Sequence, residues 1–225
     1  METQEKSNEP ESKKTISKEK LLELYMDHVL ENGEAPKSVY KFAKDNKFTE
    51  AEFYTHFGNF ESLGDEIWNE FFCRSLLLIE KDQEWENYSS REKLLLFYFT
   101  FFENLNVNRS YILCSLTQKG ETMQNLRQLK ALRNNMKKFA KELIQEEVET
   151  QEYKFFKRNG TIFSEGIWVQ TLFLLRFWMK DNSANFEKTD IAIEKSVNTA
   201  FDLFNTAPLE RMMDFGKFLW KEKVV

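Results

Sequence analysis

Glycine, proline and cysteine are scarce in this sequence of 225 residues, which contains seven Gly, three Pro and two Cys. Folds built from many short strands need Gly and Pro in their turns, so this composition argues against a turn-rich all-β protein. The two cysteines, Cys73 and Cys114, lie far apart in apolar surroundings. We therefore expect two buried free thiols in a reducing compartment and no disulfide framework.

Long apolar runs and an excess of basic charge are also missing. The longest apolar run, 94–102, is interrupted by Thr100 and falls well short of the roughly 18 residues that can span a bilayer. Residues 1–16 are polar and of mixed charge, without the apolar core of a signal peptide, and predict a disordered tail. With a net charge of −5, the chain has no global basic surface for nucleic acid. We expect a soluble, cytoplasmic protein.

The sequence patterns of catalytic and metal sites are absent as well. No Gly-rich phosphate-binding loop and no Gly-x-Ser-x-Gly turn occurs. The two histidines, His28 and His56, are too far apart to suggest a catalytic triad, and His28 has no second metal ligand at a suitable spacing. The sequence therefore predicts no catalytic residues, no metal site and no cofactor, and the protein is not expected to be an enzyme.

Aromatic side chains and helical periodicity, in contrast, are abundant. The 22 Phe residues indicate a heavily buried aromatic interior. In a helix expected to open at Ser90, apolar residues recur with the i, i+3, i+4, i+7 spacing of one helix face: Leu94, Phe97, Tyr98, Phe101, Phe102 and Leu105. Segments 121–151 and 188–205 show the same periodicity, 163–179 is apolar nearly all round, and Asn159-Gly160 predicts a corner before 163–179. These patterns predict an all-α fold.

The segment 38–63 reads as two short helices joined by a tight corner, followed by the start of a longer helix. Val39, Phe42 and Ala43 give the first helix an apolar face, and we expect Asn46 to take the left-handed conformation at the corner. Thr49 is placed as the N-cap of the second helix, with a capping-box partner at Glu52. Two short helices crossing at such a corner are the helix-turn-helix plan, whose second helix can enter a DNA major groove.

These residues resemble the N-terminal DNA-binding domain of the TetR/AcrR family of bacterial transcriptional regulators. The resemblance extends from about Lys18 to Trp68 and rests on Phe42-Ala43, on Phe48 before Thr49, on the run 53–57 and on Glu61-x-Leu63. It implies a TetR-like all-α fold with a disordered tail at 1–16, a helix-turn-helix domain at 17–59 and a helical ligand-binding and dimerisation domain at 60–225. It also implies a homodimer, in keeping with the two apolar helices expected at 163–179 and 188–205.

The resemblance also assigns roles to residues of the two short helices. It implies that phosphates are contacted by Ser38, Thr49 and Tyr54, with His56 alongside, and that bases are faced by Glu50, Ala51 and Thr55. Phosphate contacts would position such a domain, and the base-facing residues would set the sequence that it reads.

The same segment departs from the family pattern in its charge. Lys47 stands where the family usually has a corner glycine, and Glu50 and Glu52 replace its usual small or basic residues. Between Lys13 and Trp68 there are eight Lys and no Arg against eleven acidic residues, a net charge of −3. Because DNA affinity depends on neutralising phosphates, two interpretations stay open. One is a DNA-binding regulator controlled by an apolar ligand, and the other is a lipid-binding or scaffold protein of TetR shape that has lost DNA binding.

The helical body is predicted to bind an apolar or lipid-like small molecule between its helices. The candidate lining residues are Phe97, Phe101, Tyr111, Met123, Trp168 and Arg176. Each aromatic residue among them could equally be ordinary core. Arg176 is the most specific candidate, because a cation within an apolar helix must be paired or reach water. It would bind the acidic head of a ligand or form an ion pair with a carboxylate at the dimer interface.

Residues 208–223 form a final basic amphipathic segment, rich in Met, Phe and Trp and containing Arg211, Lys217, Lys221 and Lys223. Such a helix could lie on a membrane surface or on a partner protein. The alternative is a last helix packed on its own domain.

Overall fold

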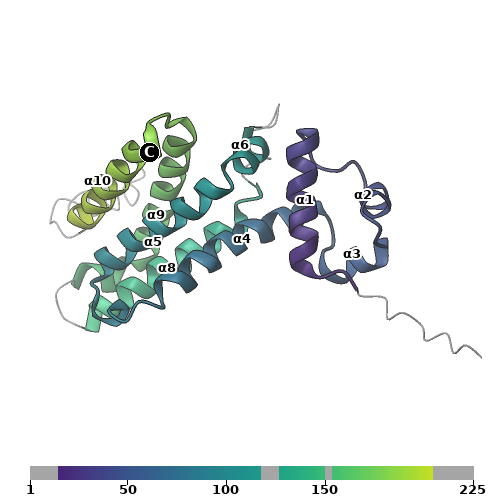
Figure 1. Ribbon diagram of the computed structural model, residues 1–225. Coiled ribbons are helices and arrows are strands. Elements are labelled where there is room, and N and C mark those ends of the chain that lie inside the picture. The colour runs from purple at the N-terminus through teal and green to yellow at the C-terminus, as the bar shows by residue number, and fades with distance from the viewer. Residues whose placement is uncertain (1–14, 118–126, 150–153, 205–225) are drawn as a thin grey trace, which may run out of the picture. The chain divides into compact units, whose positions relative to one another are not determined.

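The computed structural model describes residues 15–117, 127–149 and 154–204, and every regular element in these ranges is a helix (Figure 1). No strand occurs in them, which confirms the predicted all-α class. The chain divides into two compact units, an N-terminal unit at Met1–Leu63 and a body at Gly64–Val225. Within the described residues, no helix combines the length and hydrophobicity needed to cross a membrane.

The N-terminal unit contains α1 (Lys18–Asn32), α2 (Val39–Asp45), α3 (Glu50–His56) and the first turn of α4 (Phe60–Ile79). Its helix ends follow the signals in the sequence. The Ser17 hydroxyl accepts a hydrogen bond from the Lys20 amide and caps α1, and Gly33 ends that helix with a left-handed φ of 73°. Thr49 and Glu52 form the predicted capping box at the start of α3.

The corner between α2 and α3 differs from the prediction in one residue. Asn46 has a φ of −103°, and its side-chain amide donates to the Phe42 carbonyl at 2.8 Å. That bond holds Asn46 close to the end of α2, so the left-handed turn falls on Lys47, which has a φ of 61°. The prediction of a left-handed Asn46 was therefore wrong by one position. A side chain at Lys47 carries a conformational penalty that glycine would not.

Aromatic packing holds the N-terminal unit together around Phe42, which is 1 % exposed. Its ring contacts those of Tyr25, Phe48, Phe53 and Phe60, with centroid separations from 5.4 to 6.5 Å. Because Phe60 and Leu63 belong to this core, the unit extends into α4, a few residues beyond the boundary expected at residues 59 and 60.

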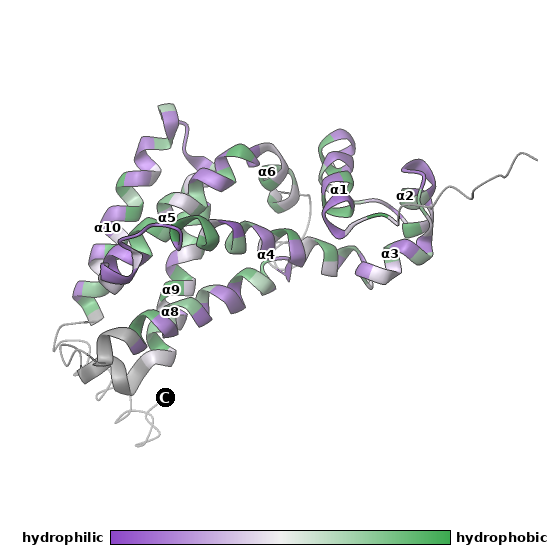
Figure 2. Cartoon of the chain, turned by 60° about the horizontal axis from the view of Figure 1, so that its bottom comes forward, coloured by the Kyte–Doolittle hydropathy of each residue, from purple (hydrophilic) through white to green (hydrophobic). Residues whose placement is uncertain are grey.

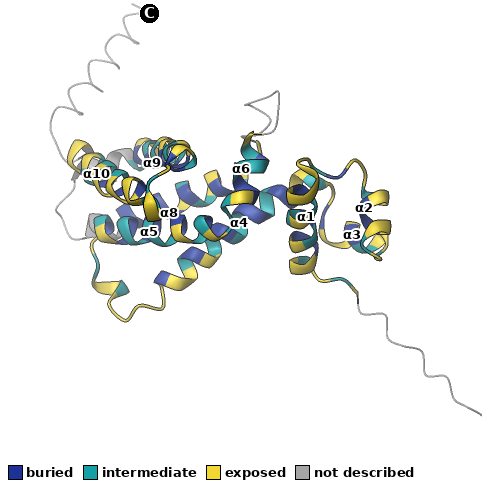
Figure 3. Cartoon of the chain, turned by 45° about the horizontal axis from the view of Figure 1, so that its top comes forward, coloured by how far each residue is buried: buried dark blue, intermediate teal, exposed yellow. Residues whose placement is uncertain are grey.

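The body contains the rest of α4 and a further set of helices: η1 (Trp85–Asn87), α5 (Ser90–Val107), α6 (Arg109–Thr117), α8 (Lys130–Glu149), α9 (Lys154–Lys180), η2 (Ala184–Phe186) and α10 (Glu187–Phe204). Helix α9 packs along α8 and α10, and α5 packs against both α8 and α10. One apolar face of α5 is buried among these helices (Figure 3), formed by Leu94, Phe97, Tyr98, Phe101, Phe102 and Leu105. Hydrophilic residues, purple in Figure 2, alternate with hydrophobic ones, green, along α8 and α10.

Helix α9 is longer than the sequence pattern predicted. It runs without a break from Lys154 to Lys180 and passes through Asn159-Gly160, where a corner was expected. A β-carbon on Gly160 would meet no atom within 4 Å, so neither packing nor a turn requires glycine there. One glycine costs a long helix only about 1 kcal/mol, which the packing of α9 on α8 and α10 outweighs.

Candidate functional site

The outer face of α3 is the first candidate site. Phe53 points into the core of the N-terminal unit, while Glu50, Ala51, Tyr54 and Thr55 are exposed, Tyr54 by 54 %. These four residues were expected to face DNA, and the structure places them together on one solvent-accessible surface. A helix held by one buried aromatic residue and open on its other side has the shape required to enter a groove.

The other three predicted DNA contacts have side chains that already make hydrogen bonds within the unit, as does Thr55, whose hydroxyl donates to the Ala51 carbonyl at 2.9 Å. Ser38 caps α2 by accepting from the Lys41 amide at 3.2 Å. The Thr49 hydroxyl donates to Glu52 at 2.8 Å, and His56 Nε2 lies 2.9 Å from the Ile16 carbonyl oxygen. This contact of His56 with Ile16 therefore connects the end of α3 to the residues just before α1.

The charge of this surface is less unfavourable than the composition of the unit suggests. Four lysines occupy α2 and its flanks, and all are exposed: Lys37, Lys41, Lys44 and Lys47. Against them stand Asp45, Glu50 and Glu52, so residues 37–56 carry a net charge of 4 − 3 = +1. The net charge counted from the sequence includes these four lysines but does not show whether they lie close together. Their spacing of three to four residues could have indicated it, because residues at that spacing are neighbours on a helix surface.

Phe97 and Phe101, two of the predicted ligand contacts, lie in the packed interior of the body. Both are fully buried, and their rings stack at 5.5 Å. Phe97 also lies 5.0 Å from the rings of Phe72 and Phe139. These two residues lie in the aromatic centre of the body, where neighbouring rings surround Phe97.

The remaining predicted ligand residues lie on other elements or outside the described residues. Tyr111 is buried on α6, Trp168 is half-buried on α9, and Met123 lies outside the described residues. Arg176 is exposed. It reaches water, one of the two alternatives for a cation within an apolar helix, because α9 leaves one face uncovered, where Val169 is 63 % and Phe173 52 % exposed.

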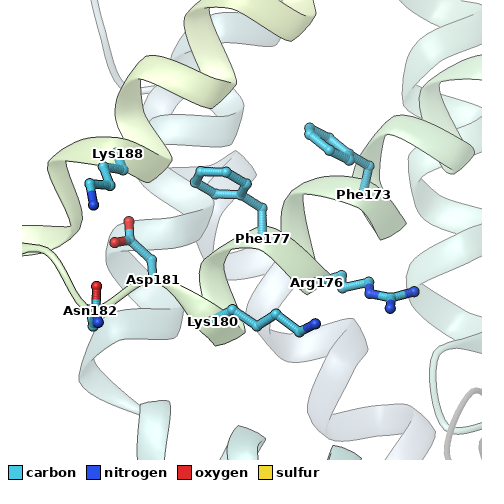
Figure 4. Close-up of a pocket in the computed structure, with 7 residues that line it drawn as sticks. All are labelled: Phe173, Arg176, Phe177, Lys180, Asp181, Asn182 and Lys188. Atoms are coloured by element: carbon cyan, nitrogen blue, oxygen red, sulfur yellow. The ribbon is translucent and has the colours of Figure 1, made fainter.

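Two open grooves follow this uncovered face. One, of about 510 Å³, lies between α9 and α10 and is lined by small and apolar residues that include Gly166, Val169, Phe173, Ala192 and Ala200. The other, of about 530 Å³, lies at the corner where α9 ends and is lined by Phe173, Arg176, Phe177, Lys180, Asp181, Asn182 and Lys188 (Figure 4). Of these residues, only Arg176 was expected from the sequence to contact a ligand.

Arg109 fixes the corner where α9 ends. Its guanidinium donates to the carbonyls of Trp178, Met179 and Asp181 at 2.9, 3.2 and 3.1 Å. It also lies 4.5 Å from the ring centroids of both Trp178 and Phe186. Carbonyl groups at a helix end have no partners within the helix, and a planar guanidinium can satisfy several at once. No pattern in the sequence pointed to this residue.

Asp181 fixes the start of α10 from the same corner. One carboxylate oxygen accepts from the amide and hydroxyl of Thr189, and the other accepts from those of Ser183. Burial by itself would raise the pKa of Asp181, but these hydrogen bonds outweigh it and lower the pKa to about 2. The stability that they contribute is complete above the ordinary pKa near 4 and is lost as the pH falls through 2.

The described residues hold no group of three or more His, Cys, Asp or Glu side chains placed to bind a metal ion. The two cysteines are free thiols and half-buried, where full burial was expected from the sequence. The segment 208–223, predicted to lie on a membrane, a partner or its own domain, is outside the described residues.

Comparison with known families identifies the body. No curated protein shows a significant match to the chain. Residues 93–219, more than half of the chain, match the family described as tetracyclin repressor-like, C-terminal domain. This match is independent of residues 38–63, which carry the resemblance noted in the sequence. The helical body and the matched segment together show that the chain belongs to the TetR family.

Proposed function

We propose that the protein is a homodimeric transcriptional regulator that binds duplex DNA through α2 and α3 and is controlled by an apolar small molecule bound to its body. The observation that carries this proposal is the outer face of α3, which exposes four residues, together with four exposed lysines on α2 and its flanks, the helix that α3 contacts. Membership of the TetR family supports it.

In this proposal α3 enters the major groove. Glu50, Ala51 and Thr55 face base edges, and Tyr54 reaches a phosphate from the same helix. A carboxylate can accept a hydrogen bond from the cytosine amino group, so Glu50 favours cytosine at its position. The four lysines on α2 and its flanks supply the phosphate neutralisation on which affinity depends. Ser38, Thr49 and His56 act mainly by holding the helices in place, since their side chains already bond within the unit.

The uncovered face of α9 and α10 supports the proposed homodimer. Ile162, Val169 and Phe173 are exposed on one side of α9, and Ile191 and Leu203 are exposed on α10. Two such helix pairs related by a two-fold axis would bury these residues in a four-helix interface. The ligand would act by binding two arrangements of the dimer with different affinity, which is the thermodynamic requirement for control.

The experiment that tests DNA binding is a titration of duplex DNA of random sequence. We expect binding at 50 mM salt that weakens steeply as salt is raised, because each neutralised phosphate adds about 0.9 to the slope of log affinity against log salt. The variant Lys41→Gln/Lys44→Gln should bind more weakly and lower that slope by about 1 for each phosphate that it no longer neutralises.

The matched control is Lys141→Gln, which removes an exposed lysine from α8 in the body. It should leave both affinity and slope unchanged. Absence of binding by the wild type at 50 mM salt would contradict the proposal and favour a protein of TetR fold that no longer binds DNA.

A further inference from the structure

The last turn of α4 exposes two adjacent apolar residues, Leu77 and Leu78, which we call the leucine patch. They are 59 % and 53 % exposed, while Ile79, the final residue of α4, is buried. Isolated apolar residues are common on protein surfaces, but a contiguous patch is a candidate contact surface. Because the patch belongs to α4, it lies outside the α9–α10 face that a second copy covers in the proposed homodimer.

An acidic segment, residues 80–87, follows this patch directly. It contains four acidic residues and one lysine, a net charge of 1 − 4 = −3, and all five are exposed: Glu80, Lys81, Asp82, Glu84 and Glu86. The carboxylates of Asp82 and Glu84 accept hydrogen bonds from neighbouring residues. Among the residues that the structure describes, those of Glu80 and Glu86 form neither a hydrogen bond nor an ion pair. The end of α4 therefore joins an apolar patch to unneutralised negative charge.

Helix α10 ends at the same end of the body. The guanidinium of Arg91, in the first turn of α5, donates to Asp202 at 2.7 Å and to Asn198 at 3.3 Å, so the last turns of α10 lie beside the start of α5. The acidic segment lies there too, because the Lys93 ammonium is 5.2 Å from the ring centroid of Trp85. In Figure 1 the ends of α4 and α10 and the start of α5 share one end of the body. The chain that follows α10 therefore leaves the body at the end that carries the leucine patch.

The sequence that follows Phe204, of 225 − 204 = 21 residues, contains a segment of matching chemistry. Within 208–223, apolar residues recur at spacings of three, four and seven and on a helix would share one face: Leu209, Met212, Met213, Leu219 and Trp220. Residues 215–223 hold three lysines and one glutamate, a net charge of 3 − 1 = +2. An apolar face with an excess of lysine complements the leucine patch and the acidic segment beside it.

We propose that residues 208–223 pack against the leucine patch of their own chain, with their lysines toward the acidic segment. Chain length does not limit this contact, because 21 residues extend to about 70 Å, more than twice the length of the twenty-residue helix α4. The proposal selects packing on its own domain, rather than a membrane or a partner protein, as the role of this segment. It requires neither DNA binding nor the proposed homodimer.

The test is hydrogen exchange of the full-length protein, measured peptide by peptide. In the wild type we expect the amides of 209–221 to exchange at least about tenfold more slowly than those of a free peptide of the same sequence. Leu77→Ser/Leu78→Ser, the patch variant, should remove this protection while the amides of α5 and α9 keep theirs, because both leucines are exposed. Glu80→Gln/Glu86→Gln should speed exchange in 209–221 by a smaller factor, roughly twofold to fivefold, as expected for exposed charge pairs.

Val107→Ser is the matched control, because Val107 is an apolar residue that is 85 % exposed at the far end of α5. It should leave exchange in 209–221 unchanged. Fast exchange of this segment in the wild type would overturn the proposal. Equal exchange in the wild type and the patch variant would overturn it too, because the segment would then lie elsewhere.

Two further measurements separate the other possible contacts of this segment. The wild type should not sediment with vesicles of phosphatidylglycerol, and co-sedimentation would mean that the segment is free to bind a membrane. Mixing the patch variant with Leu219→Ser/Trp220→Ser, which keeps an intact patch, should not restore slow exchange to 209–221 of the patch variant. Restored protection would overturn the proposal, because the segment would then lie on the patch of a second copy.

Discussion

Replacing Phe42 by Ala should unfold the N-terminal unit and leave the body folded. Phe42 is 1 % exposed and contacts four other aromatic rings drawn from α1, the α2–α3 corner, α3 and α4. Truncation of a buried Phe to Ala costs about 3–5 kcal/mol. A unit of some 50 described residues has few other apolar contacts with which to absorb such a loss.

Hydrogen exchange measured peptide by peptide is the suitable readout, because it reports the two units separately. Amides of α1 to α3 should lose protection in Phe42→Ala, while those of α5 and α9 keep it. Tyr40→Ala is the control, since Tyr40 lies two residues away on α2 and is 61 % exposed. Equal loss of protection in α5 would show that the units do not fold independently and would contradict the division at Leu63.

Replacing Arg109 by Met should destabilise the body by about 3 kcal/mol, because hydrogen bonds to charged groups contribute about 1.5–3 kcal/mol each and are not additive. The change keeps most of the side-chain volume but leaves the carbonyls of Trp178, Met179 and Asp181 without their donor. It also removes the cation that lies against the rings of Trp178 and Phe186.

Chemical denaturation followed by tryptophan fluorescence measures this loss directly. Arg109→Lys should recover only part of it, because an ammonium group cannot donate in the planar arrangement of a guanidinium. Arg74→Met, at an exposed position of α4, should change stability by less than about 0.5 kcal/mol. If Arg109→Met were as stable as Arg74→Met, the corner of α9 and α10 would not depend on this side chain.

Features that depend on neighbouring residues could be predicted from the sequence. The caps at Ser17 and Thr49 and the end of α1 at Gly33 each involve groups within four residues of one another. Small errors occurred where two neighbouring residues could fill the same role. Ser89 caps α5 where the sequence pointed to Ser90, and the Ser90 hydroxyl instead donates to the Leu143 carbonyl at 2.6 Å.

Features that depend on distant residues could not be predicted in this way. Arg109 reaches carbonyls about 70 positions away, and no local pattern encodes that contact. The uncovered face of α9 that carries Arg176 could not be located from the sequence, because hydropathy shows that a helix is apolar but not which of its faces another helix covers. The lysines around α2 were likewise counted only in the net charge of the segment, whereas their effect on DNA binding depends on where they lie in the folded unit.

Selection from a pool of random duplexes by the full-length protein tests the central claim most directly. A two-fold symmetric dimer with one α3 per subunit should enrich an inverted repeat whose half-sites are about one helical turn apart, or a multiple of that distance. We expect such a repeat, with cytosine at the position faced by Glu50 and with that preference lost in Glu50→Ala. A pool that keeps its starting composition at low salt would contradict the account.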